Sequence, residues 1–392
     1  MVNTLLTPTQ VTRKALMILH QKLNFIGSIN RGYDDSFAKD GAKIGDTLKI
    51  RVPNQYTVRS NATLSPQDTA ETSVNLQVAT QKGVDVNFSS NELTLSLDDF
   101  ADRVLEPAMS ALAANIEADA MSMYKDVYQS AWTNGAAITF TKVLQGRKRL
   151  VDSLAPLNDR SCNLNTQDNV DLVDALKGLF QDSSSIAKQY REGYMGRTAG
   201  FDFMENTLWP SHTRGGSNGY LTNGATQTGG TLNVDTGTGA PSAGDVFTIA
   251  GVFAVHPETK AVSSQLQQFV VGAGATTTVW PISPAIIPVA AGVGNSNASN
   301  AAADNSAITF FGTASTAIGM SLAYQKNAFA FATADLVLPR GVDFAAREVL
   351  DGISMRIVRQ YDIVNDKFPC RVDVLYGYKT IRPQLAIRLH NN

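Results

Sequence analysis

The sequence of 392 residues is poor in the side chains on which most metal sites and disulfide frameworks depend. It has two cysteines, Cys162 and Cys370, and four histidines, His20, His212, His256 and His390. The cysteines are too few for a disulfide framework and lack CxxC spacing, and no two histidines are four residues apart. We therefore expect a reducing compartment, no metal site and no cofactor.

Charge is scarce as well. Charged residues make up 17% of the chain, and 33 basic against 35 acidic side chains leave a net charge of −2. A dedicated nucleic-acid-binding protein normally carries a strong basic excess, so this balance argues against that class, although loose contact with a polyanion stays open. So few charges are typical either of an ordinary low-charge globular protein or of a protein whose surface something else covers, and composition does not separate the two.

Long apolar runs are missing. No stretch of 18 apolar residues occurs, so we predict no transmembrane helix and no membrane partner. The first 25 residues have an apolar helical rhythm that Arg13, Lys14, His20 and Lys22 interrupt. This segment has neither the apolar centre nor the small-residue cleavage site of a signal peptide.

Catalytic motifs are also few. The sequence contains no phosphate-binding loop and no complete G-x-G-x-x-G, and a G-x-S-x-G pattern occurs at 215–219 with Ser217 at its centre. A true nucleophile elbow lies between a strand and a helix, whereas loop-like sequence flanks this one on both sides. We predict that the chain is not an enzyme, and a serine hydrolase using Ser217 is the weaker alternative.

What the first third of the chain does contain is a succession of distinct segments. A short amphipathic helix is predicted within 1–27, and its terminal position makes it an arm. Alternating runs joined by a polar loop predict a protruding two-stranded extended loop at 28–95. A long helix is predicted for 96–132, with a kink or a fresh start at Pro107.

The remaining two thirds mix α/β sequence with one insertion. Helices and short apolar pieces alternate over 133–223 and again over 307–345, and the chain ends in strands at 346–392. Between them, 224–306 is rich in Gly, Ser, Thr and Asn around short strands, which predicts an inserted all-β barrel. At about 80 residues this barrel is just large enough to fold alone. Its expected core is Val246, Phe247, Ile249, Val252, Phe269, Val271 and Trp280.

The order of segments resembles the major capsid protein fold of tailed bacteriophages, the Johnson or Hong Kong ninety-seven fold. More narrowly, it is similar to the coat proteins of short-tailed phages that carry an inserted accessory barrel. The stretches that suggest this are "GDVFTIAGVFAVHPETK" at 244–260, "KNAFAFATADLVLP" at 326–339 and "DGISMRIVRQYDIVNDKFPCRVDVLYGYKTIRPQLAIRL" at 351–389. The likeness spans essentially the whole chain and implies an α+β fold with arm, extended loop, spine helix, axial domain and inserted barrel.

The resemblance implies assembly and not catalysis. Copies would form the pentamers and hexamers of an icosahedral shell around double-stranded DNA, which they would contact non-specifically. Scaffolding protein and a portal would be partners during assembly in the host bacterial cytoplasm, and the mature location would be the virion. The helix 96–132 and the strands 346–392 would form the peripheral domain, and 133–223 with 307–345 the axial domain. Another virion structural protein, of the tail or for decoration, is the alternative.

Two basic groups are candidate subunit contacts. Residues 353–358 and 371–376 are predicted to pair as antiparallel strands, with Arg356 and Arg371 on one face beside Asp373. These arginines would meet acidic groups on a neighbouring capsomer, or they lie on a solvated face. The second group, Arg147, Lys148 and Arg149, is either a solvated helix face or a contact with a neighbouring subunit or packaged DNA.

Overall fold

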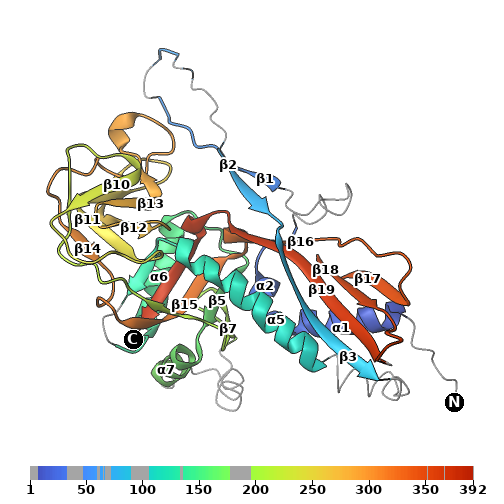
Figure 1. Cartoon of the computed structure of the whole chain (residues 1–392). Helices are drawn as coiled ribbons and strands as arrows, with labels where there is room; N and C mark the ends of the chain where they lie inside the picture. The colour runs from blue at the N-terminus through green and yellow to red at the C-terminus, as the bar shows by residue number, and fades with distance from the viewer. Residues whose placement is uncertain are drawn as a thin grey trace. The chain divides into compact units, whose positions relative to one another are not determined.

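The computed structural model describes residues 8–32, 47–59, 62–64, 66, 72–89, 106–132, 136–176, 196–350, 352–365 and 367–391 (Figure 1). The chain divides into two compact units, each assembled from separate stretches of sequence. The first unit comprises Met1–Ile50, Asn75–Met121 and Phe329–Lys379, and the second comprises Arg51–Val74, Ser122–Ala328 and Thr380–Asn392.

The first unit is built on a five-stranded sheet. The strands lie in the order β16 (Phe329–Ala334), β19 (Lys367–Thr380), β18 (Ile353–Arg359) and β17 (Phe344–Leu350), and β3 (Thr80–Ser89) also pairs with β19. Val84 of β3 faces Val372 across the antiparallel ladder. The period-two pattern of β3 therefore marks one strand of this sheet.

The described part of the first unit also contains helices α1 (Pro8–Lys22), α2 (Phe25–Ser28) and α5 (Glu106–Met121). The predicted apolar stripe of α1 is core, because Leu16, Leu19 and Leu23 are buried and α1 contacts both α5 and β17. The buried carboxylate of Glu117 on α5 accepts the backbone N–H of Asn24 and, at 2.6 Å, that of Phe25. A carboxylate there satisfies free N–H groups at the start of α2.

The predicted helix 96–132 is shorter than expected within the described residues. Residues 96–105 lie outside them, and Pro107 is in the first turn of α5, where proline is tolerated. The α-helix ends at Met121 and is followed by a 3₁₀ helix, η3 (Ser122–Asp126), and by β4 (Ser130–Trp132). The predicted C-terminal end of the helix was wrong because the buried residues Met123, Tyr124 and Val127 continue the apolar spacing beyond Met121.

The predicted extended loop 28–95 is only partly correct. Strands β1 (Thr47–Val52) and β2 (Thr72–Gln77) do pair as a two-stranded sheet. The third strand of this region, β3, belongs to the sheet of the first unit, where it pairs with β19 from Thr80 to Ser89. The hairpin therefore involves a smaller part of 28–95 than predicted.

The described part of the second unit contains a seven-stranded sheet and the helices α6 (Phe140–Asp152) and α7 (Thr166–Leu176), which lie in the predicted α/β segment 133–223. The Asp168 N–H donates to Asn165 Oδ1 at 2.7 Å, which is an N-cap bond at the start of α7. The strand order is β4, β20 (Ala386–Asn391), β15 (Ala317–Gln325), β5 (Arg160–Leu164), β7 (Phe201–Glu205) and β6 (Arg197–Thr198), and β8 (Ser211–Thr213) pairs with β15.

The second unit also holds the inserted β domain. Its strands follow the order β14 (Ile308–Phe310), β11 (Val246–Val255), β12 (Val262–Val271), β13 (Val279–Ile286), β10 (Gly229–Asp235) and β9 (Leu221–Thr222). A bridge between Leu221 and Ala307 joins the first and last of these strands, so the sheet closes into a barrel. The core cluster contains six of the seven predicted residues, Val246 being the exception.

The observed boundaries of these parts differ from the predicted ones. The barrel needs β9 and β14, which lie outside 224–306, and Tyr220 and Ile308 belong to its core. The predicted segment 307–345 is divided, because β15 joins the second unit and β16 the first. Likewise β20 pairs with β15 and leaves the first unit.

Candidate assembly surface

The predicted strand pair near the C-terminus is present in the first unit. Ile357 pairs with Val372 and Arg356 with Asp373 in an antiparallel register. The Tyr376 hydroxyl donates to Asp119 on α5 at 2.6 Å, so the apolar face of the pair lies toward this helix. The six apolar residues of that face are all buried: Ile353, Met355, Ile357, Val372, Val374 and Tyr376.

Both predicted contact arginines of this pair bind one carboxylate within the subunit. Arg356 donates to Asp373 Oδ2 at 2.6 Å and Arg371 donates to Asp373 Oδ1 at 2.8 Å. Asp373 is 1% exposed, and a Cβ atom on Gly83 of the neighbouring strand would lie 2.6 Å from its Oδ1. Glycine at position 83 therefore leaves the space that the shared carboxylate occupies.

The two arginines differ in how much of the side chain is exposed and in how many hydrogen bonds it makes within the subunit. Arg356 also donates to the carbonyl oxygen of Val337 at 2.7 Å, and 16% of its side chain is exposed. Arg371 is 57% exposed, and its hydrogen bond to Asp373 raises its pKa above the usual value. The guanidinium of Arg356 is therefore used for hydrogen bonds within the subunit, whereas that of Arg371 is a permanently charged group at the surface.

The described residues of the turn that joins β18 and β19 are hydrogen-bonded to one another and include two exposed apolar side chains. The Asp362 carboxylate accepts the Val364 N–H at 3.0 Å and the Asn365 side-chain N–H at 2.7 Å, which lowers the pKa of Asp362. Ile363 and Val364 are 82% and 84% exposed. Two adjacent branched aliphatic side chains are thus held in water by a hydrogen-bonded turn.

The basic group on α6 is not a single face. Successive helical residues point about 100° apart, and Lys148 pairs with Asp152 at 2.6 Å while Arg149 is half-buried. Burial lowers the pKa of Arg149, and Arg147 lies beside Gly200. Structure therefore separates three residues that sequence grouped together.

The alternative nucleophile Ser217 lacks an activating base. His212 uses both ring nitrogens elsewhere, with Nε2 2.8 Å from Asp245 Oδ1 and Nδ1 3.1 Å from the Tyr124 hydroxyl. The Ser217 hydroxyl is buried and has no hydrogen-bond partner among the described residues. Because a serine nucleophile needs an adjacent base to remove its proton, this arrangement does not support hydrolase chemistry.

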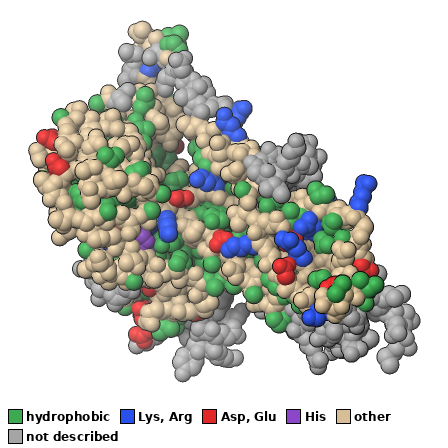
Figure 2. All heavy atoms as spheres, viewed as in Figure 1, with side chains coloured by type: hydrophobic (Ala, Val, Ile, Leu, Met, Phe, Trp, Pro, Cys, Tyr) green, Lys and Arg blue, Asp and Glu red, His purple; other side chains and the backbone are tan. Residues whose placement is uncertain are grey.

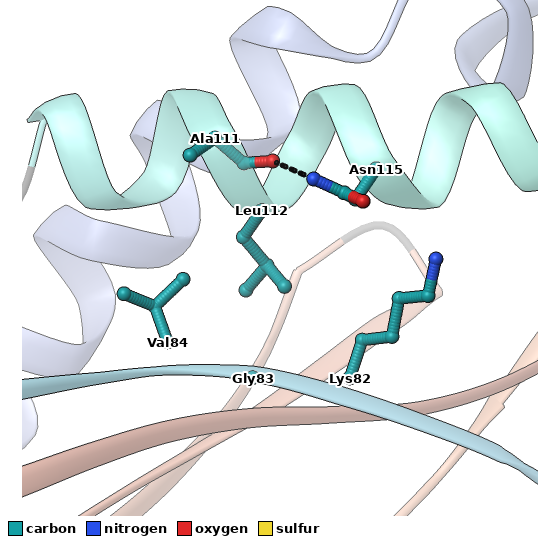
Figure 3. A pocket seen from close by; sticks show the side chains of 6 residues that line it. All are labelled: Lys82, Gly83, Val84, Ala111, Leu112 and Asn115. Atoms are coloured by element: carbon teal, nitrogen blue, oxygen red, sulfur yellow. Dashed lines mark hydrogen bonds between the residues drawn. The ribbon is translucent and has the colours of Figure 1, made fainter.

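A small pocket of about 360 Å³ lies between β3 and α5 in the first unit (Figure 3). Lys82 and Val84 point from the strand toward the helix, and Leu112 points back toward the strand. Lys82 Nζ is 2.7 Å from Asp119 Oδ2, and the Asn115 side chain donates to the Ala111 carbonyl oxygen at 3.1 Å. The polar groups at this pocket are engaged within the fold, so it shows no ligand chemistry.

The described part of the chain shows neither a metal site nor a membrane-spanning helix. No group of three or more His, Cys, Asp or Glu side chains there could hold a metal ion. No helix there has the length and apolar character needed to cross a membrane. Figure 2 shows charged side chains scattered sparsely over the visible face, in keeping with the low charge of the sequence.

Comparison with known families gives the class. The family model described as "P22 coat protein - gene protein 5" matches residues 37–389. The chain belongs to this coat protein family. It is therefore a major capsid structural protein with an α+β phage capsid fold, and not an enzyme. The resemblance noted from the sequence is confirmed.

Two solved structures illustrate what the chain is similar to. A chain from Mycobacterium phage Che8 has a TM-score of 0.49 and 13% identity, over 94% of this chain and 90% of that one. The CUS-3 coat protein I-domain has 32% identity and a TM-score of 0.19, over 26% of this chain and 96% of that one. Comparison with curated proteins found no match.

Sequence reasoning identified the charged face of the coat protein but missed its partners. Asp373 was noted beside the arginines, yet nothing in the alternation indicates that one carboxylate serves both. Gly83 was not singled out, although a glycine within an alternating strand is a signal for close approach of a neighbouring group. The exposed pair Ile363 and Val364 could have been found as aliphatic residues inside a turn.

Proposed function

We propose that this coat protein closes an icosahedral shell of hexamers and pentamers through the β18–β19 turn and Arg371. The observation that carries the proposal is the exposure of Ile363 and Val364, 82% and 84%, at the end of a firmly paired hairpin. Fully burying an aliphatic side chain of this size stabilises by about 1.5–3 kcal/mol. A contact that covers both would contribute binding energy without any rearrangement of the turn.

Charge at the same hairpin supports a defined orientation of that contact. Arg371 is the more exposed of the two predicted arginines, and acidic groups on a neighbouring subunit would complement it. Arg356 is excluded from this role because only 16% of its side chain is exposed and its guanidinium also donates to the Val337 carbonyl oxygen. For Arg147, Lys148 and Arg149 a subunit or DNA contact stays a prediction.

The remaining partners follow from the coat protein family. Scaffolding protein and a portal would act during assembly in the bacterial cytoplasm, and the finished shell would enclose double-stranded DNA. The net charge of −2 argues against dedicated binding of that DNA and is compatible with loose, non-specific contact. The predicted division into peripheral and axial domains is retained as part of this proposal, with the boundaries moved to those of the two units.

The proposal is tested by removing the exposed apolar groups. Full-length protein with Ile363→Ser and Val364→Ser should remain folded, because neither side chain is buried, but should fail to form closed shells. Negative-stain electron microscopy and gradient sedimentation measure assembly, and circular dichroism measures folding. Val170→Ser, at a position 62% exposed on α7, is the matched control and should assemble normally.

Two results would overturn the proposal. Shells of normal size and yield from the double variant would show that the turn is not a contact. Tubes or small particles from the unmodified chain would show that it does not close shells.

A further inference from the structure

A groove in the second unit is unrelated to the hairpin just described. It has a volume of about 650 Å³ and lies along the barrel strand β12, helix α6 and the 3₁₀ helix η6 (Pro383–Leu385). All the residues that line it are described, and the extended segment Val52–Gln55 forms part of its wall. Since none of these residues belongs to the first unit, a test of the groove is independent of the shell-closing proposal.

One wall of the groove is an open strand edge. Strand β12 pairs with β11 along most of its length, but with β13 only at Val270 and Val271. Within the described part of the chain, residues 262–269 therefore have a strand partner on one side only, although the Gln265 N–H donates to Ser263 Oγ at 3.1 Å and the Gln268 carbonyl oxygen accepts the Gln267 side chain at 3.0 Å. An edge of this kind presents backbone N–H and C=O groups to an added extended segment.

The second observation is an excess of positive charge. Lys148, Arg149 and Arg382 line the groove together with one carboxylate, Asp152, which pairs with Lys148. The guanidinium groups of Arg149 and Arg382 form no hydrogen bond or ion pair with the described residues. Burial lowers the pKa of Arg149 although the nearby Asp152 opposes this shift, and a further carboxylate beside Arg149 would stabilise its charge.

A third observation comes from buried amide oxygens. Gln129 is 5% exposed and donates its side-chain N–H to Ser153 Oγ at 2.7 Å and to the Gln384 carbonyl oxygen at 3.1 Å. Its Oε1 atom has no partner among the described residues, and neither has Oδ1 of Asn54, another residue that lines the groove. These acceptors suit the N–H groups of a peptide backbone, whereas a nucleic-acid phosphate offers no donor.

We infer that this groove binds an extended acidic peptide segment of a partner protein, which adds a strand to the open edge of β12 and places carboxylates on Arg149 and Arg382. The geometry assigns specificity to the two arginines and the strand register to the backbone of 262–268. Seven residues of an added strand span about 23 Å at roughly 3.3 Å per residue. A nucleic acid is the competing occupant that the experiment must distinguish.

The test uses the full-length chain and a synthetic probe. The probe is a fluorescein-labelled heptapeptide in which valine and glutamate alternate, and binding is followed by fluorescence anisotropy at low ionic strength. Arg149→Gln and Arg382→Gln should each weaken binding by about fivefold or more, because each removes one charge-assisted contact. Arg147→Gln is the matched control, since Arg147 lies on the same helix but does not line the groove.

Two further probes keep the test decisive if a variant folds poorly. On the unmodified chain, a peptide with glutamine in place of glutamate and a peptide N-methylated at alternate positions should both bind at least about fivefold more weakly. Equal binding of the glutamate and glutamine peptides, or no binding of either, overturns the inference. Displacement of the peptide by a single-stranded DNA oligonucleotide that binds more tightly, and loses affinity in the same two arginine variants, overturns it in favour of a nucleic-acid site.

Discussion

The inserted barrel and the sheet of the first unit bury their apolar faces in different ways. The barrel closes its sheet on itself and packs Trp280 against Phe247 and Tyr220, with ring centroids 5.6 and 4.9 Å apart. The sheet of the first unit depends on helices α1 and α5 to cover its apolar face, and its hairpin holds Ile363 and Val364 in water. We therefore expect the self-contained barrel to stabilise the subunit, and the first unit, with its exposed apolar turn, to join subunits as proposed above.

Cutting both elements out of the chain should give the largest difference. A segment 216–312 contains β9 and β14 with their closing bonds, Thr222 N–H to Ser306 O and Ile308 N–H to Tyr220 O. It should unfold in one cooperative urea transition, followed by the fluorescence of Trp280. The segment 224–306 lacks the closing strands and should show none, as should 343–377 from the first unit, followed by circular dichroism.

Similar unfolding transitions of segments 216–312 and 224–306 would contradict the assignment of β9 and β14 to the barrel. A cooperative transition of equal midpoint for 224–306 would mean that β9 and β14 are attachments and not part of the barrel. A stable isolated 343–377 would mean that the sheet of the first unit needs neither helix.

The same elements show what sequence can predict. Long alternating runs such as 353–358 and 371–376 were correctly paired because the buried face fixes the register. Strands β9 and β14 have two and three residues, which is too short for any periodicity, so the barrel boundary was set inside its true limits. The pairing of β3 with β19 was also missed, because alternation identifies a strand and not its distant partner.

For the candidate site too, the sequence predicted some features and not others. Which residues are charged and share a face follows from period two, so Arg356, Arg371 and Asp373 were found together. The partners of each charge depend on burial and on residues outside the strand pair. Val337 accepts a hydrogen bond from Arg356, and Gly83 leaves room for the Asp373 carboxylate. For α6 the sequence proximity of Arg147, Lys148 and Arg149 was misleading, because a helix turns consecutive side chains apart.

Within the barrel, a single truncation should be costly. Trp280 is fully buried and contacts the rings of Tyr220, Phe247 and Phe310, so Trp280→Ala should lower the free energy of unfolding of segment 216–312 by about 3–5 kcal/mol. Urea unfolding followed by circular dichroism measures it. Val279→Ala, at a neighbouring position that is 38% exposed, is the control and should change the value by about 0.5 kcal/mol or less. A similar loss in both variants would show that the barrel core is not centred on Trp280.

The smallest effects separate the two arginines of the first unit. Arg356→Gln removes a donor from a carboxylate that is 1% exposed, and should lower the free energy of unfolding of the full-length chain by about 1–3 kcal/mol. Arg371→Gln removes a donor that is 57% exposed and screened by solvent, so the loss should be about 1 kcal/mol or less. Hydrogen exchange of peptides from β18 and β19 measures both changes locally. The yield of closed shells should fall more in Arg371→Gln than in Arg356→Gln, because only Arg371 is proposed to contact a neighbour.

A double-mutant cycle with Asp373→Asn measures how strongly each arginine is coupled to this carboxylate. The coupling energy of Arg356 to Asp373 should exceed that of Arg371 to Asp373. Equal couplings together with equal shell yields would mean that the two arginines form one structural cluster and that neither is reserved for assembly.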